Sequence, residues 1–136
     1  MNAHTQKILQ VWESKNKILQ PNNTKINLDI IDQIAYLFAA GSFYYYIINF
    51  DTLEMDFVHE GTKDVLGIAP EDFSVDTLFN IMHPNDLEVM HKKEAVATDF
   101  LLNKISTDKI PQYKVSYLMR LKHTNGSYKT ILHQTK

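Results

Sequence analysis

Cysteine is absent from the 136 residues. Its absence excludes disulfides, thiolate metal sites, cysteine nucleophiles and flavin photochemistry that depends on a thiol. A chain without disulfides is compatible with a reducing compartment, so we expect a cytoplasmic protein. No run approaches the ~18 apolar residues of a membrane span, and the charged N-terminal segment does not resemble a secretory leader. We therefore expect no contact with a membrane.

Arginine is almost absent as well, since Arg120 is the only one. The lysines are scattered and the net charge is −2, so we expect no direct binding of nucleic acid by this segment. Glycine-rich phosphate loops, HExxH and recognisable nucleophile arrangements are also missing from the sequence. The chain is therefore predicted not to be an enzyme.

Aromatic residues, by contrast, gather in one stretch. Residues 43–50 read FYYYIINF, a strand-like run that is apolar on both faces. Such a strand must be covered on both sides. The next segment, EMDFVH, predicts a second strand and hence a hairpin.

Two helices are predicted before this hairpin, over residues 3–20 and 28–40. Asn27 can cap the second helix, and Gly41 suits a left-handed C-terminal cap. The second helix is apolar around much of its circumference, so we expect it to be largely buried. The first helix carries an apolar stripe formed by Ile8, Val11, Trp12, Ile18 and Leu19.

Residues 1–41 thus form a helical lead-in that could serve in dimerisation. We expect the stripe of the first helix to lie on the outer sheet face, near Leu118 and Ile131, or on a second copy of the chain. Either arrangement favours a homodimer.

A long helix and a hairpin complete the chain. Pro84 suits the first position of a helix that runs to about residue 104, and His83 suits its cap. Asn125-Gly126 predicts a two-residue hairpin turn. That turn would pair residues whose numbers sum to 251, and would place Tyr128, Thr130 and Leu132 on the core face with Val115, Tyr117, Met119 and Leu121.

Four motifs resemble those of the PAS family, in the family's order. They are the strand pair in YYYIINFDTLEMDFVH, the short segment KDVLGIAPEDF, the helix opening HPND, and the hairpin RLKHTNGSYKTIL. The resemblance covers residues 43–136. The tyrosine-rich first strand and the helical lead-in are similar, more narrowly, to N-terminal PAS modules of LuxR-type transcriptional regulators of Bacteroidetes-like bacteria.

The resemblance implies an α+β fold in which residues 42–136 form a PAS-like sensor domain. PAS sheets have five strands in the order 2-1-5-4-3, but only four are predicted here, over residues 43–50, 54–59, 113–123 and 128–135. We therefore expect the last strand to be missing, with the sheet completed by a neighbouring chain or left irregular.

Glu94 is the residue that points to a binding site. At helical spacing it falls on an apolar face with Leu87, Met90, Ala97 and Leu101, and a buried carboxylate needs a partner. A hydroxyl of Tyr45, Tyr117 or Tyr128 could serve. These four residues are the candidate ligand pocket. Two alternatives stay open: the tyrosines simply fill the core, or the helix rotates and Glu94 reaches water.

Some PAS domains hold haem through a histidine of the long helix, and His91 and His83 lie there. Because His83 suits a cap and His91 stands beside two lysines, we expect no haem, no other cofactor and no metal. The resemblance implies a non-enzymatic sensory module that regulates an attached output domain, for which a DNA-binding regulator is the first choice, with or without an unknown small ligand. The alternatives are a ligand-free dimerisation module and the input domain of a histidine kinase or cyclic-dinucleotide enzyme.

Overall fold

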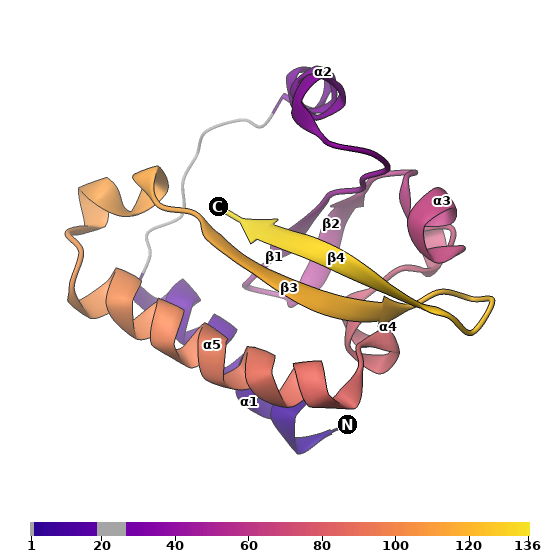
Figure 1. Ribbon diagram of the computed structural model, residues 1–136. Coiled ribbons are helices and arrows are strands. Elements are labelled where there is room, and N and C mark those ends of the chain that lie inside the picture. The colour runs from indigo at the N-terminus through magenta and orange to yellow at the C-terminus, as the bar shows by residue number, and fades with distance from the viewer. Residues whose placement is uncertain (1, 19–26) are drawn as a thin grey trace.

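The computed structural model of the chain describes residues 2–18 and 27–136 (Figure 1). The expectations for Leu19 and for the predicted end of the first helix at residue 20 lie outside the described residues. The elements are α1 (Ala3–Ile18), α2 (Leu28–Phe38), β1 (Tyr46–Asn49), β2 (Glu54–Val58), α3 (Thr62–Leu66), the 3-10 helix η1 (Pro70–Asp72), α4 (Val75–Ile81), α5 (Pro84–Asn103), the 3-10 helix η2 (Thr107–Gln112), β3 (Val115–Lys122) and β4 (Tyr128–Thr135).

This mixture of helices and antiparallel strands confirms the α+β class. The strands form two separate two-stranded sheets, β1 with β2 and β3 with β4. Over the described ranges no backbone ladder joins the two sheets, so a single continuous PAS-like sheet is not formed. Side chains bridge the interval instead, because the rings of Tyr46 and His133 lie 6.4 Å apart between centroids.

The predicted register of the final hairpin is wrong by one residue. Lys122 pairs with Tyr128, so paired numbers sum to 250. The loop is longer than a two-residue turn: the Gly126 amide donates to the His123 carbonyl, the His123 amide donates to Ser127, and Gly126 has φ 92°. This is a three-residue loop with glycine in the left-handed region. A shift of one residue reverses the faces of β4, so Leu132 points outward, 60% exposed.

The expected position of the first helix is also wrong. α1 lies along α5 instead of on the outer sheet face, and Figure 1 shows the two helices side by side. Ile8 and Trp12 are buried in the main core, where the Trp12 ring contacts Phe50 and Phe79. Trp12 is 5% exposed in this position, whereas Leu118 on the outer sheet face stays 63% exposed.

The second helix begins as predicted, since the Asn27 side chain accepts hydrogen bonds from the Asp29 and Ile30 amides. Its predicted burial is wrong, because none of its residues is buried. Figure 1 shows α2 on the far side of the hairpins from α1 and α5. The two leading helices therefore lie on opposite sides of the hairpins.

The start of α5 is fastened to β3. His83 caps the helix by accepting from the Asn85 amide, as expected. Asp86 accepts from the Arg120 backbone amide, from Nε and from a terminal guanidinium nitrogen at 2.7–2.9 Å. The hydrogen bonds from Arg120 hold the pKa of Asp86 below its ordinary value. The sole arginine therefore has an internal partner.

A buried carboxylate shared by three elements

Glu94 lies at the junction of α1, α5 and β3. Its side chain is 4% exposed. Trp12 Nε1 of α1 donates to Glu94 Oε2 at 3.0 Å, and the Tyr117 hydroxyl of β3 donates to Glu94 Oε1 at 2.9 Å. Each carboxylate oxygen thus accepts from a different element. The alternative in which Glu94 reaches water is not observed.

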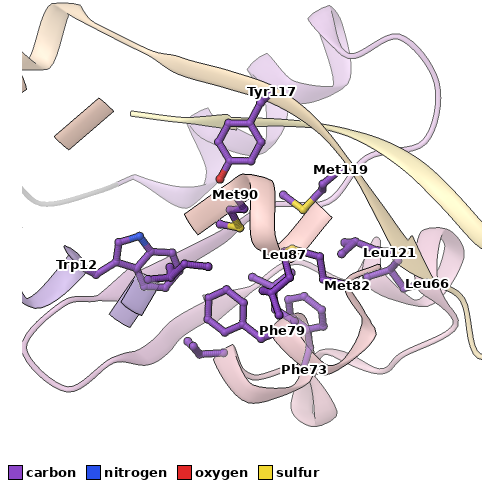
Figure 2. Close-up of a cluster of buried hydrophobic side chains, with 13 residues drawn as sticks. Trp12, Leu66, Phe73, Phe79, Met82, Leu87, Met90, Tyr117, Met119 and Leu121 are labelled. Carbon is purple, nitrogen blue, oxygen red and sulfur yellow. The ribbon is translucent and has the colours of Figure 1, made fainter. Parts of the chain in front are cut away.

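The surroundings of this carboxylate are aromatic. Figure 2 shows Tyr117 projecting from β3 with its hydroxyl toward the helix that carries Met90, and Trp12 beside the same helix. The Tyr117 ring lies 5.0 Å from the His133 ring, and Lys93 Nζ lies 5.6 Å from its centroid. Burial, followed by the charge of Glu94 and the hydrogen bond to it, raises the pKa of Tyr117. The hydroxyl therefore stays protonated and remains a donor.

The structure brings together only two of the four candidate pocket residues. Glu94 and Tyr117 touch, whereas the Tyr45 hydroxyl lies beside Asp32 of α2, 3.4 Å from its Oδ1. Tyr128 is 44% exposed and its ring lies 5.0 Å from that of His83. The register shift of β4 moves Tyr128 off the core face, and strand alternation sends Tyr45 to the face opposite Tyr46. Whether Glu94 and Tyr117 meet a ligand stays a prediction.

Sequence reasoning missed Trp12 as a partner of Glu94. The signal was present, because a buried tryptophan needs an acceptor for its indole N–H and Glu94 is a carboxylate on an apolar face. The helix that carries Trp12 has one indole N–H on its apolar face, and the helix that carries Glu94 has one carboxylate on its apolar face. The two helices could have been paired on that basis.

A second polar cluster, around His59, was not predicted. His59 is 8% exposed. Its ring stacks between Phe43 and Tyr45, at centroid distances of 5.2 and 4.7 Å. Its Nδ1 accepts from the Gly61 amide at 3.0 Å, which places the proton on Nε2, and Nε2 lies 3.1 Å from Asp32 Oδ1. This stack also explains why the aromatic run is apolar on both faces. Phe43 and Tyr45 pack with His59 on one face, and Tyr44 and Tyr46 pack on Phe73 on the core face.

Two hollows lie outside the Glu94 cluster. One, of about 570 Å³, is lined by the end of α2, the following loop and residues 59–61, 63 and 64, with His59 among them. The other, of about 290 Å³, lies between α1 and α5. It is lined in part by Thr98, whose buried hydroxyl has no hydrogen-bond partner among the described residues.

Two further histidines, His4 and His91, lie close together but do not form part of a metal site within the described residues. His91 Nδ1 lies 3.2 Å from His4 Nδ1, and burial and the neighbouring Lys7 lower the pKa of His91. Within residues 2–18 and 27–136, no three histidine, aspartate or glutamate side chains are placed to hold a metal ion.

No family model and no curated protein matches this chain. Among the described helices none is both long and apolar enough to cross a membrane. Each carboxylate oxygen of Glu94 already accepts a hydrogen bond from the protein itself. The Glu94 cluster is therefore suited to a structural role, as a link between elements. The cluster ties a helix from the N-terminal part of the chain to a strand from its C-terminal part.

Proposed function

We propose that the chain is a non-enzymatic signal-transduction module of PAS type, which regulates an attached output domain, with a DNA-binding regulator as the first choice. The observation that carries this proposal is the Glu94 link. Trp12 and Tyr117 are 105 residues apart in the chain, yet both donate to one carboxylate.

Such a link supports coupling between distant parts of the chain. A buried acceptor that loses a donor costs about 1–3 kcal/mol, so movement of β3 away from Glu94 changes the stability of the site where α1 docks. Two arrangements that differ by a few kcal/mol are what a regulatory element requires. A ligand or partner that displaces Tyr117 would therefore alter the docking of α1.

The proposal is tested by joining the chain to a DNA-binding reporter domain that binds its operator unaided. Tyr117→Phe removes one donor and leaves the ring in place, so repression by the fusion is expected to differ from that by the wild type. Ser116→Ala serves as the control, because Ser116 is an exposed neighbour on the same strand.

Equal repression by wild type, Tyr117→Phe and Trp12→Phe would contradict the proposal, provided that fluorescence or chemical denaturation shows the link to be altered. Equal effects of Ser116→Ala and Tyr117→Phe would also contradict it, since the response would not depend on Glu94.

A ligand-free module is the second candidate, and one observation favours it. Glu94 and Tyr117 satisfy each other inside a cluster filled by Trp12, Phe79 and Met90, and the two hollows lie elsewhere. Trp12 is the only tryptophan, so its fluorescence can report whether small molecules change this cluster. A panel of candidate ligands that leaves the emission unchanged is expected if the second candidate is correct.

A further inference from the structure

Among the described helices that contain no buried residue, α2 is the longest. Four large apolar side chains form its outer stripe, here called the α2 stripe: Ile30 at 53% exposure, Ile34 at 53%, Leu37 at 75% and Phe38 at 77%. On a helix these positions span an arc of about 100° at ~100° per residue, so they form one face.

The opposite face of α2 holds it to the rest of the chain. Asp32, about half a turn away from the α2 stripe, lies 3.1 Å from His59 Nε2 and accepts from the Tyr45 hydroxyl at 3.4 Å. The Tyr36 ring meets the Phe43 ring edge-on at 5.2 Å. Leu28, Ile31 and Ala35 lie between Asp32 and the edge of the α2 stripe, and they are half-buried. These contacts set the orientation of α2 and leave the α2 stripe facing outward.

An eleven-residue helix is too short to be stable on its own propensity and depends on burial of its apolar face. The exposed fractions of the α2 stripe amount to roughly 500 Å², which matches the largest apolar patches left on monomers and more than half of what each partner buries in a standard interface. A binding partner is therefore expected to cover the α2 stripe.

We propose that the α2 stripe is the seam of a homodimer, in which α2 packs against α2 of a second copy. A twofold interface places a surface against itself. The α2 stripe suits this because it contains no charge, so self-pairing brings no like charges together. The two acidic residues of the helix lie off the seam. Asp29 is in the first turn, and Asp32 is on the opposite face, where its contact with His59 tethers α2 to the rest of the chain. The small net charge of −2 adds little repulsion between copies.

A lipid surface fits the α2 stripe less well. Helices that lie on membranes carry lysine or arginine on the polar face, whereas residues 27–41 contain neither and hold two aspartates. The homodimer predicted from the sequence is thus assigned to α2, since Ile8 and Trp12 of α1 are committed to the core of their own chain.

Single-cysteine cross-linking tests the assignment directly, because the chain has no cysteine of its own. Leu37→Cys places the only thiol in the α2 stripe. Leu118→Cys is the matched control, a leucine of similar exposure on the outer face of β3. Under mild oxidation, Leu37→Cys is expected to give a covalent dimer on a non-reducing gel, and Leu118→Cys is expected to stay monomeric on that gel.

Analytical ultracentrifugation gives the second readout. Leu37→Lys is expected to weaken self-association about tenfold or more, and Leu118→Lys is expected to leave it unchanged. Since Leu37 is 75% exposed, the fluorescence of Trp12 and the circular dichroism of Leu37→Lys should match the wild type and exclude unfolding.

Three results would overturn the proposal. The first is a wild-type chain that sediments as a monomer at every concentration at which it stays dissolved. The second is a dimer that cross-links through Leu118→Cys and not through Leu37→Cys. The third is a wild-type monomer that binds phosphatidylcholine or phosphatidylglycerol vesicles through Leu37. None of these results bears on coupling through Glu94, which the reporter fusion measures separately.

Discussion

Replacing Tyr117 by phenylalanine removes one hydroxyl from the buried cluster and leaves the ring that packs beside His133. The hydroxyl donates to Glu94 Oε1 at 2.9 Å, and the two side chains are 8% and 4% exposed. Solvent has little access to restore the lost hydrogen bond. A buried acceptor deprived of a donor costs about 1–3 kcal/mol, so we expect Tyr117→Phe to lower the free energy of unfolding by about 2 kcal/mol.

Substitutions at Glu94 give graded controls for the predicted loss in the free energy of unfolding. In Glu94→Gln the amide oxygen can accept from Trp12 while the amide N–H donates to the Tyr117 oxygen, so the loss should be about 1 kcal/mol. Glu94→Leu has a similar volume but accepts from neither donor. Because it leaves two buried donors without this acceptor, a loss of about 2–5 kcal/mol is expected.

Urea denaturation followed by the fluorescence of Trp12, the sole tryptophan, and by circular dichroism gives these free energies. We expect Glu94→Leu to be less stable than Glu94→Gln, and we expect Tyr117→Phe to cost little more once Glu94 is already leucine. If Glu94→Leu proves as stable as the wild type, or if the two losses simply add, the carboxylate does not depend on Tyr117 and the proposed link is refuted.

Three further predictions concern pH and backbone geometry. Burial raises the pKa of Tyr117 above the ordinary 10.0, so its contribution is present below pH 10 and is lost as pH rises further; the alkaline fall in melting temperature should be shallower in Tyr117→Phe. The pKa of Asp86 is lowered from 3.8 by its hydrogen bonds to Arg120, so the contribution of Asp86 to stability is lost as pH falls below 3.8. The difference in melting temperature between wild type and Asp86→Ala should therefore shrink between neutral and strongly acid pH. Gly67 has φ 74° and a methyl group there would meet the final hairpin loop, whereas Gly126 has φ 92° in open space; Gly126→Ala should cost about 1 kcal/mol from backbone strain alone, and Gly67→Ala more, as measured by denaturation.

Local patterns in the sequence were enough to predict where most elements begin and end. Asn27 caps α2 and His83 caps α5 because caps depend on side chains one turn away or closer. The final hairpin was placed by Asn125-Gly126 for a similar reason. Its register was not, since the same two residues also fit a three-residue loop, and the choice between the loops depends on how the strands pack.

The carboxylate site was half predicted. That Glu94 would need a donor followed from its place on an apolar helix face. Which donor it meets depends on which face each strand turns inward, and a one-residue shift of register or an alternating side chain decides that. Tyr117 therefore became the partner, while Tyr45 turned to Asp32 and Tyr128 to the surface.

By itself the sequence determined that both leading segments are helices with apolar faces, because periodicity is a property of neighbouring residues. Only the tertiary structure decided what covers each face. Trp12 carries α1 into the core, where its indole finds both aromatic contacts and an acceptor in Glu94. The tether of Asp32 to His59 holds α2 on the other side of the molecule with its apolar stripe outward. An apolar face in the sequence predicts that the face will be removed from water. Because the hydrophobic effect has no direction, the sequence pattern does not determine which surface will cover that face.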